Sequence, residues 1–278
     1  GVHTRAERVV SSAQAGAALL AQHVPAGSKV LITGTEALAD CVRAVGLETV
    51  RKEEEGPVAV IQGFDPKIGW EDLAEAAYTL ANPDILWIAT NTDQSIPKER
   101  GQAPGNGTLV AAVASATRRT PLVAGKPEAP IFHTAAKAVN SSRPVIVGDR
   151  LDTDILGANN AKMDGALVLT GVQTYQDVIE AVPNQRPTYI LRTLEDFFAP
   201  YPEIEVLYEG YEVTATGPTW QARVRGENLS LTGPEIEDAE AFAGSESEAE
   251  AWRVACAAWW AANPEQGARP NIQGIPGA

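Results

Sequence analysis

Short apolar runs of strand length alternate with segments of helical spacing along most of this chain of 278 residues. Five such runs are rich in Val, Ile, Leu and Ala, and they cover residues 30–32, 58–61, 85–89, 144–147 and 166–170. Segments with helical periodicity separate them, at residues 11–23, 35–45, 70–80, 109–116, 129–139 and 155–161. This order is typical of parallel sheets, because each crossover helix covers one face of the sheet. We therefore predict an α/β fold, with residues 90–107 as a long polar loop.

The pattern changes after about residue 203. Residues 211–216 and 220–224 alternate between apolar and polar side chains, which predicts an antiparallel hairpin. Residues 247–261 have the spacing of an amphipathic helix. The tail from Asn263 is rich in Gly and Pro, and we expect it to be loose.

The charge of the chain limits its partners. It has 36 acidic against 22 basic residues, which gives a net charge of −14. No overall basic surface for nucleic acid is present, and an anionic membrane would repel the chain. An anionic substrate would need a local positive site, from a metal or from a few placed cations. The two cysteines, Cys41 and Cys256, form no CxxC pair, and this favours a reducing cytoplasm.

The strongest signal for chemistry is an acidic run that directly follows the apolar residues 144–147. It reads GDRLDTD and contains Asp149, Asp152 and Asp154. Ligand sites in parallel sheets form at the carboxyl ends of strands, and clustered carboxylates there suit Mg²⁺. Alternatively, Asp152 and Asp154 only cap the helix that follows. The residues alone leave both interpretations open.

A second signal is the run Gly125-Lys126-Pro127, which also follows an apolar strand. A lysine at this place can hold a phosphate or a catalytic carboxylate as a compact point charge. Most loop lysines are simply solvated, so this signal is weak when taken alone.

The two signals together carry a family resemblance. The order of strand, GKP, helix, strand and GDRLDTDI, followed by residues 168–172, resembles the NagD-like phosphatases of the haloacid dehalogenase superfamily. Residues 89–93 and 104–107 resemble the large α/β cap of that branch. The resemblance covers roughly residues 5–195. It is closest to the actinobacterial glycerol-3-phosphate phosphatases, which also carry a C-terminal extension.

The resemblance implies a fold and a division into domains. We expect a Rossmann-like parallel-sheet core whose N-terminal part is missing, a large α/β cap and a small α+β extension. The expected parts are a core fragment, the cap, the core and the extension with its tail, at residues 1–26, 27–120, 121–203 and 204–278.

The resemblance also implies roles for single residues. Lys126 is expected to steady the nucleophile and the substrate phosphate, and Asp149 to be the side-chain ligand of Mg²⁺. Asp154 is expected to order the waters around the metal, whereas Asp152 falls at a variable position and receives no role. Lys162 stands where the family usually has a glycine that ends a helix in the left-handed conformation. Lysine at such a position costs about 1 kcal/mol.

The cap loop of residues 93–97 matches the substrate-specificity loop of the family. Asn91, Asp93 and Ile96 are therefore expected to contact the substrate, and Ile96 at the tip would favour a small one. We expect a Mg²⁺-dependent phosphatase for a small phosphomonoester, first of all glycerol 3-phosphate. Phosphoglycolate or a sugar phosphate is the alternative, and an inactive binding fragment is an alternative of another class.

One part of the family's machinery is missing from the sequence. The family forms an aspartyl phosphate on an aspartate in a DxDG motif, and the 278 residues contain no such motif. We expect the nucleophile to lie outside this chain, on about two strand–helix units that precede it, and the chain alone to be inactive. The expected partner is a small phosphorylated metabolite, without nucleic acid or membrane, and a homodimer is left open.

Overall fold

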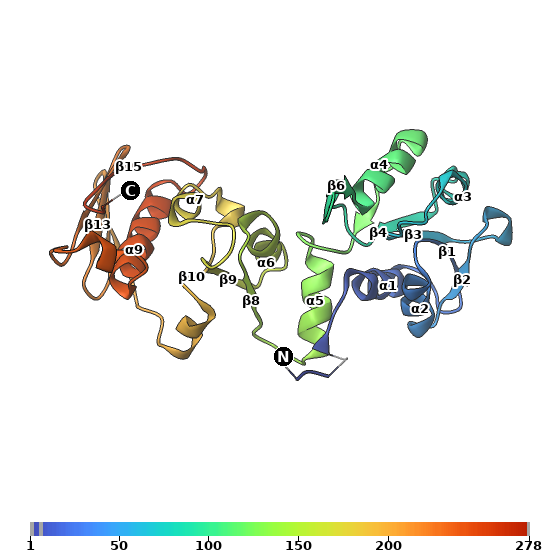
Figure 1. The fold of residues 1–278 in the computed structure, drawn as a ribbon, viewed down its shortest axis with the longest axis horizontal. Helices are drawn as coiled ribbons and strands as arrows, with labels where there is room; N and C mark the ends of the chain where they lie inside the picture. The colour runs from blue at the N-terminus through green and yellow to red at the C-terminus, as the bar shows by residue number, and fades with distance from the viewer. Residues whose placement is uncertain (1–2, 6–7, 277–278) are drawn as a thin grey trace. The chain divides into compact units, whose positions relative to one another are not determined.

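The computed structural model describes residues 3–5 and 8–276. The chain forms two compact units, residues 1–142 and residues 143–278, and Figure 1 follows the chain through both. Each unit has its own sheets and its own hydrophobic core, and each is described here by itself.

The first unit is built on a parallel sheet of five strands. Its strands are β1 (Lys29–Thr33), β2 (Glu48–Val50), β3 (Ala59–Gln62), β4 (Leu86–Ala89) and β7 (Leu122–Val123). They lie in the order β2-β1-β3-β4-β7, and every pair is parallel. The sequence prediction of a parallel α/β sheet is therefore confirmed.

Helices cover both faces of this sheet. They are α1 (Ser12–His23), α2 (Glu36–Ala44), α3 (Trp70–Leu80), α4 (Asn106–Thr117) and α5 (Ala129–Ala138), with the short 3-10 helix η2 (Glu53–Glu55). Alternation along the strands assigns the side chains to the faces: Val30 and Ile61 pack with α1 and α2, whereas Leu31 and Val60 pack with α3 and α4. The helix α1, which was expected in a core fragment, packs against α2 and α5.

The second unit begins with a parallel sheet of three strands in the order β10-β9-β8. The strands are β8 (Val145–Gly148), β9 (Asp164–Val168) and β10 (Tyr189–Leu191). Short helices connect and follow them, namely the π-helix η3 (Leu151–Ile155), α6 (Leu156–Asn160), α7 (Tyr175–Ile179), η4 (Pro183–Gln185) and η5 (Leu194–Phe198). Among the described strands, β8 pairs with β9 alone and forms one edge of the sheet.

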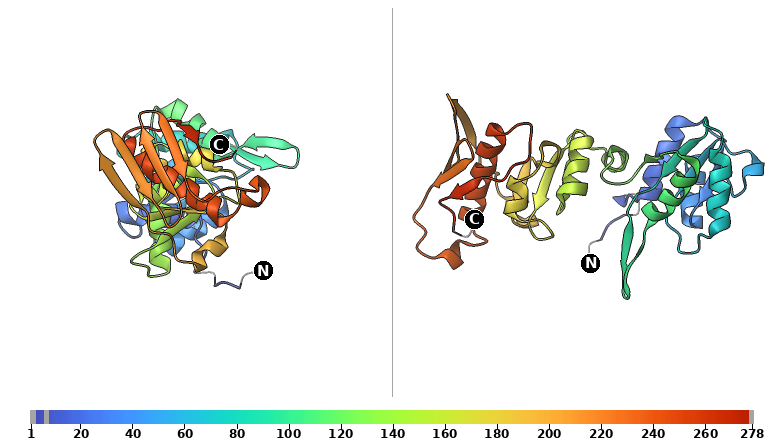
Figure 2. Two further views of the ribbon diagram at one scale, coloured as in Figure 1. Left: turned by 90° about the vertical axis from the view of Figure 1, so that its left-hand side faces the viewer. Right: turned by 90° about the horizontal axis from the view of Figure 1, so that it is seen from above.

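The rest of the second unit is a five-stranded sheet with a long helix on one face (Figure 2). Its elements are β11 (Glu205–Glu209), β12 (Glu212–Thr216), β13 (Gln221–Arg225), β14 (Asn228–Thr232), α8 (Ala239–Phe242), α9 (Glu246–Ala262) and β15 (Asn271–Gln273). Val213, Ala222 and Val224 point into the core beneath α9, which is buried along most of its length. The same core continues to Leu167 and Val178 of the three-stranded part. The finer division into four parts stays a prediction.

Two segments differ from the prediction. The predicted polar loop of residues 90–107 contains an antiparallel hairpin of β5 (Ser95–Lys98) and β6 (Gly101–Pro104), which extends away from the sheet in Figure 2. Its side chains are mostly exposed, so no apolar alternation marks it in the sequence. The tail expected to be loose contains β15, which adds to β14 as a parallel strand. Both expectations were wrong because a ladder depends on a partner strand that local composition does not show.

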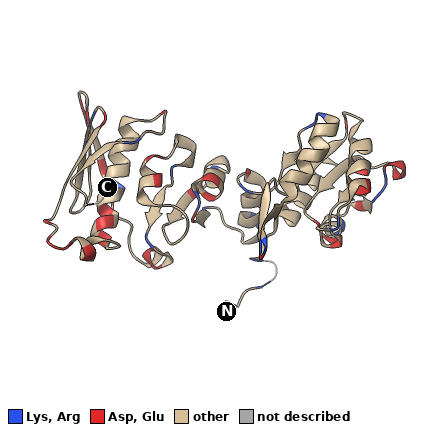
Figure 3. Cartoon of the chain, turned by 45° about the horizontal axis from the view of Figure 1, so that its top comes forward, with Lys and Arg blue, Asp and Glu red and all other residues tan. Residues whose placement is uncertain are grey.

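Asp and Glu residues, red in Figure 3, are spread along both units. This agrees with the excess of 36 acidic over 22 basic residues in the sequence. Within the described residues, no helix has the length and apolar character needed to cross a lipid bilayer.

Candidate active site

The acidic run lies at the carboxyl end of the three-stranded sheet. β8 and β9 are parallel, with Gly148 opposite Leu167, so both strands end at the same edge. Asp149 directly follows β8, and residues 169–173 follow β9. Asp149 is half-buried in the loop after β8. The expected position of Asp149 at a strand end is therefore confirmed.

A wide helical turn brings Asp154 back toward the end of β8. In the π-helix η3, the amides of Asp154 and Ile155 both donate to the carbonyl of Arg150, each at 3.1 Å. The Arg150 amide in turn donates to Oδ2 of Asp154 at 3.2 Å. Asp154 is only 6% exposed. The turn thus places a second carboxylate below the loop that carries Asp149.

The space for Asp154 comes from a glycine. A Cβ atom at Gly148 would lie 2.3 Å from both Cβ and Cγ of Asp154 and 2.5 Å from its Oδ2. No side chain fits at those distances, so the carboxylate of Asp154, six residues later in the sequence, requires a glycine at position 148.

Asp152 is engaged on the surface. Nε and Nη2 of Arg150 donate to its two carboxylate oxygens at 2.9 and 2.7 Å. The hydrogen bonds to Arg150 lower the pKa of Asp152, and the same pair raises the pKa of Arg150. This two-point ion pair gives Asp152 a local partner, and the expectation that it has no role in the site stays a prediction.

The acidic loop fits a hard divalent cation. Mg²⁺ is held in proteins by one or two carboxylates and keeps several of its waters. Asp149, half-buried, and Asp154, buried, provide such a pair of carboxylates at one strand end. Within the described part of the chain, no group of three or more His, Cys, Asp and Glu side chains forms a denser metal cluster. With these two carboxylates, water would complete the coordination of a bound Mg²⁺.

Lys126 lies in the first unit, in the turn after β7. It is exposed, and the amide of Glu128 closes the turn on the carbonyl of Gly125 at 3.0 Å. A Cβ at Gly125 would lie 2.6 Å from the carbonyl oxygen of Thr90, so the turn passes close to the end of β4. Lys126 thus belongs to one unit, and Asp149 to the other.

The predicted substrate loop follows β4 and is held by the first turn of α4. Nδ2 of Asn106 donates to the carbonyl of Asn91 at 2.7 Å. The amide of Gly107 donates to the carbonyl of Asp93 at 2.8 Å, and the hydroxyl of Thr108 to that of Gln94 at 2.7 Å. The loop therefore has its backbone fixed.

The side chains of this loop keep more freedom than its backbone. The side chain of Asn91 accepts a hydrogen bond from the amide of Asp93 at 3.3 Å, and Asp93 is exposed. Ile96 is half-buried on β5 opposite Ala103. The three residues expected to contact substrate thus lie on one short segment of the first unit.

Buried polar side chains gather at the same edge of the five-stranded sheet. The hydroxyl of Thr33, both amide atoms of Gln62 and Oδ1 of Asn106 are buried and have no hydrogen-bond partner in the described structure. Thr33 and Gln62 end β1 and β3, so this edge is polar beneath the loop after β4. Sequence reasoning missed Gln62, and it noted Asn106 only as part of the resemblance.

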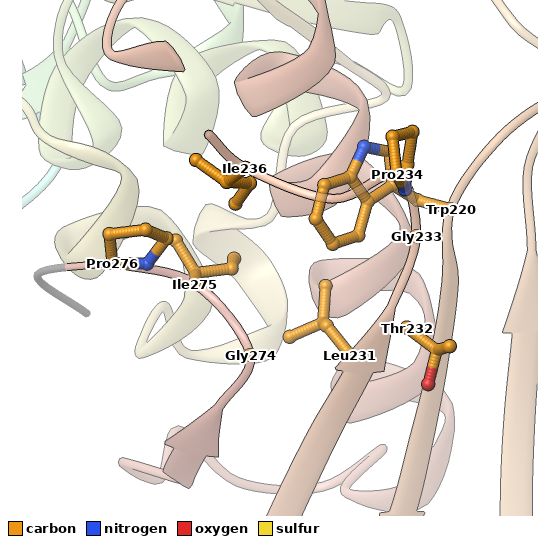
Figure 4. Close-up of a pocket in the computed structure, with 9 residues that line it drawn as sticks. All are labelled: Trp220, Leu231, Thr232, Gly233, Pro234, Ile236, Gly274, Ile275 and Pro276. Carbon is orange, nitrogen blue, oxygen red and sulfur yellow. The ribbon is translucent and has the colours of Figure 1, made fainter. Parts of the chain in front are cut away.

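A separate cavity of about 520 Å³ lies in the extension (Figure 4). Most of the residues that line it are apolar, among them Trp220, Leu231, Ile236 and Ile275. Nε1 of Trp220 donates to the hydroxyl of Ser247 at 3.0 Å. None of the nine described lining residues is charged, so this cavity does not have the chemistry of a phosphate or metal site.

Comparison with known proteins places the same segments in a known family. The sequence model of the HAD-hydrolase-like family matches residues 123–197, which contain both Lys126 and the acidic loop. The chain is 44% identical over 244 residues to D-glycerol 3-phosphate phosphatase of Mycobacterium tuberculosis. That match covers 86% of this chain and 66% of the mycobacterial protein, so the chain spans about two thirds of that relative's length.

Two further comparisons agree. Acid sugar phosphatase of Staphylococcus saprophyticus is 36% identical over 199 residues, which are 70% of this chain and 74% of that protein. The crystal structure of glycerol phosphate phosphatase from Mycobacterium tuberculosis in complex with magnesium superposes with a TM-score of 0.78 at 38% identity. That superposition covers 98% of this chain and 76% of the mycobacterial chain.

Proposed function

We propose that this chain, which belongs to the NagD-like phosphatases of the haloacid dehalogenase superfamily, acts as part of a Mg²⁺-dependent phosphomonoesterase. One observation carries the proposal. Asp149 directly follows β8, and the carboxylate of Asp154 accepts a hydrogen bond from the amide of the next residue, Arg150, within the segment that matches the family. The 44% identity to a D-glycerol 3-phosphate phosphatase supports the same chemistry.

The proposed substrate is glycerol 3-phosphate. The support is the identity to the mycobacterial phosphatase together with Ile96, a bulky apolar side chain on the hairpin of the substrate loop. A sugar phosphate is the second candidate, since the acid sugar phosphatase is 36% identical. Phosphoglycolate remains a third possibility from the sequence.

The proposed nucleophile is an aspartate outside the 278 residues. The open edge of the three-stranded sheet supports this, because β8 pairs with β9 alone among the described strands. Val145 and Val147 on β8 are 40% and 41% exposed. An open edge strand with exposed apolar side chains is the kind of surface that a further strand covers. A strand at this edge would end beside Asp149 and could carry the attacking carboxylate there.

The chain's own residues would prepare the phosphate for attack. Asp149 would hold Mg²⁺, which supplies positive charge to the phosphoryl oxygens when it is bound. Asp154 would accept hydrogen bonds from the waters around the metal. The positive Lys126 ammonium would attract and orient the substrate phosphate and the attacking carboxylate. Its charge would offset the repulsion of an anionic substrate by the net charge of −14. Attack of the carboxylate on phosphorus would form the aspartyl phosphate as the bond from phosphorus to the glycerol oxygen breaks, and glycerol would leave with a proton from a general acid outside the 278 residues. Water would then hydrolyse the aspartyl phosphate to the free carboxylate and inorganic phosphate.

Phosphate release by matched variants tests this function. The polypeptide should comprise the 278 residues together with the preceding strand–helix units, and glycerol 3-phosphate should be the substrate. We expect Asp149→Asn to abolish Mg²⁺-dependent release and Asp152→Asn, which removes the same charge from the same loop, to keep it. Equal activity of the two variants would contradict the assignment of Asp149. Phosphate release by the 278 residues alone would contradict the external nucleophile.

A substrate panel tests the specificity. Glycerol 3-phosphate, phosphoglycolate and a hexose phosphate should be compared in the parent polypeptide and in Ile96→Ala. We expect glycerol 3-phosphate to give the highest kcat/KM, and the smaller side chain to raise kcat/KM for the hexose phosphate. A parent enzyme that prefers the hexose phosphate would favour the second candidate instead.

A cytoplasmic location is part of the proposal. Cys41 and Cys256 are both free thiols, and Cys256 is buried, where burial raises its pKa. A protein whose two cysteines stay reduced fits a reducing compartment. Cell fractionation with an antibody against the chain tests this location.

A further inference from the structure

Gly171 lies against the side chain of the proposed metal ligand. It stands in the loop after β9, on the side of the sheet where the carboxyl ends of β8 and β9 lie. A Cβ atom built on Gly171 would lie 2.0 Å from Oδ2, 2.5 Å from Cγ and 2.4 Å from Cβ of Asp149. Real Cβ atoms do not approach other atoms so closely, so any other residue at this position must displace Asp149.

The backbone of Gly171 does not itself require a glycine. Its φ lies outside the left-handed range that favours glycine, unlike that of Gly27 or Gly56. Gly171 is also exposed, and all three near contacts of a Cβ there are atoms of Asp149. The three atoms nearest to a Cβ at position 171 thus all belong to that one side chain.

Rotation of Asp149 cannot relieve such a collision. Its carboxylate could swing away about the bond between Cα and Cβ, but its Cβ atom stays in place during that rotation. Because this Cβ lies 2.4 Å from the added atom, the backbone of one of the two loops would have to move. Gln173 also lies in the loop after β9, and its Oε1 accepts a hydrogen bond from the Leu151 amide at 3.3 Å. A shift of the loop after β9 would thus affect the acidic loop at two contacts, that of Gly171 with Asp149 and that of Gln173 with Leu151.

We propose that Gly171 is a positioning residue for Asp149 and that the loop after β9 is the wall that holds the metal-binding carboxylate in place. This inference rests on the proposed function, because it takes Asp149 as the ligand of Mg²⁺. It assigns to the loop after β9 the role of a support, in which Gly171 acts on Asp149 through close steric contact. A support of this kind should affect the affinity for the metal more than the stability of the fold.

Calorimetric titration with Mg²⁺ tests the proposal on the polypeptide that includes the preceding strand–helix units. We expect Gly171→Ala to weaken Mg²⁺ binding by about 10–100-fold, the usual effect of losing a support of a metal ligand. The matched control is Gly69→Ala, where the added Cβ would lie 3.9 Å from its nearest neighbour, Oδ2 of Asp72. The control should bind Mg²⁺ as the parent does. An unchanged affinity in Gly171→Ala would overturn the proposal.

A double-mutant cycle separates the steric cause from a general effect on folding. In an Asp149→Gly background the colliding atoms are gone, so Gly171→Ala should leave the melting temperature unchanged. In the parent background the same change should lower it. If Gly171→Ala alone does not fold, the double variant should fold, and failure of both would overturn the proposal.

The two hypotheses can fail separately. If Asp149→Asn binds Mg²⁺ as tightly as the parent, the metal assignment in the proposed function fails. If Asp149→Asn loses binding whereas Gly171→Ala keeps it, the function stands and only the role of Gly171 is refuted.

Discussion

Two loops at the carboxyl ends of parallel strands are held in place at different atoms. The loop after β4 is fixed through its backbone, because Asn106, Gly107 and other groups of the first turn of α4 donate to its carbonyls. The loop after β8 is fixed through its side chains, because Gly148 and Gly171 leave room only for the aspartates beside them. Both loops also have close glycine contacts: a Cβ at Gly107 would lie 2.1 Å from the carbonyl oxygen of Thr92 in the first loop, whereas the atoms met at Gly148 and Gly171 belong to aspartate side chains of the second. The first loop is thus held at its backbone and the second at its carboxylates.

This difference suits two different tasks. A loop held by its backbone can exchange its side chains without losing its course, which suits the recognition of substrates that differ between related enzymes. A loop that fixes the carboxylates themselves suits a metal site, in which the ligand positions must be set within a small error. The predictions below act on one loop or the other, and they are arranged from the largest expected effect to the smallest.

The strongest perturbation of the loop after β8 is Gly148→Ala. The new methyl group would lie 2.3 Å from both Cβ and Cγ of Asp154. Asp154 is only 6% exposed, so it has little room to move away. We expect the free energy of unfolding to fall by about 1–3 kcal/mol, as for overpacked cores, together with the loss of Mg²⁺ binding. Urea unfolding and calorimetry measure the two effects. A variant with parental stability would contradict the close contact.

The corresponding change in the loop after β4 is Asn106→Ala. It removes the 2.7 Å hydrogen bond to the Asn91 carbonyl and should lower the free energy of unfolding by about 1–3 kcal/mol. Because the loop contacts substrate in the proposed function, KM should rise severalfold whereas kcat and Mg²⁺ affinity change little. Thr108→Val removes an exposed hydrogen bond of the same loop and should have a smaller effect. A fall in kcat alone would contradict this division of tasks.

Lys162→Gly should stabilise the protein. Lys162 has a φ of 59°, so the left-handed position expected from the sequence is confirmed. The substitution should raise the free energy of unfolding by about 1 kcal/mol, because only glycine adopts this conformation without strain. Lys137→Gly, within helix α5, should instead destabilise by about 1 kcal/mol. Mg²⁺ affinity should stay unchanged in both variants, and a change in Lys162→Gly alone would show that strain at 162 reaches the site.

The smallest effect is expected for Asp152→Asn. The pair of Arg150 and Asp152 is largely exposed, so its loss should cost at most about 1 kcal/mol. The pKa of Asp152 is lowered in the folded state by the hydrogen bonds from Arg150. Its contribution is therefore present above the ordinary carboxyl pKa of 3.8 and is lost as the pH falls through the lower folded value. Unfolding of parent and variant at several pH values should show a difference that disappears in acid; a difference that grows in acid would reverse the sign.

The sequence predicted those features that depend on local pattern. The helix α3 begins and ends at the predicted residues 70 and 80, because apolar side chains at helical spacing define both ends. The strand β8 and the position of Asp149 followed from a β-branched run that ends in Gly-Asp. The π-helix η3 was not predicted, since the same letters also fit the start of an ordinary helix.

The features that depend on a partner far away in the sequence were missed. The strand β15 forms because β14 offers an open edge, and the composition of the tail gives no sign of that edge. Gly171 matters because of a side chain at the end of the neighbouring strand, and a lone glycine after a strand does not show what lies across from it. The hydrogen bonds of Asn106 to the loop after β4 are likewise set by the packing of α4.

Calorimetric titration of Mg²⁺ into Asp149→Asn and Asp152→Asn tests the central claim most directly. Both variants lose one negative charge from the same loop, so a general electrostatic effect would weaken binding equally in the two. The account predicts that Asp149→Asn shows no measurable Mg²⁺ binding and that Asp152→Asn binds as the parent polypeptide does. Equal affinities in the two variants would contradict the claim that the loop after β8 holds the metal through Asp149.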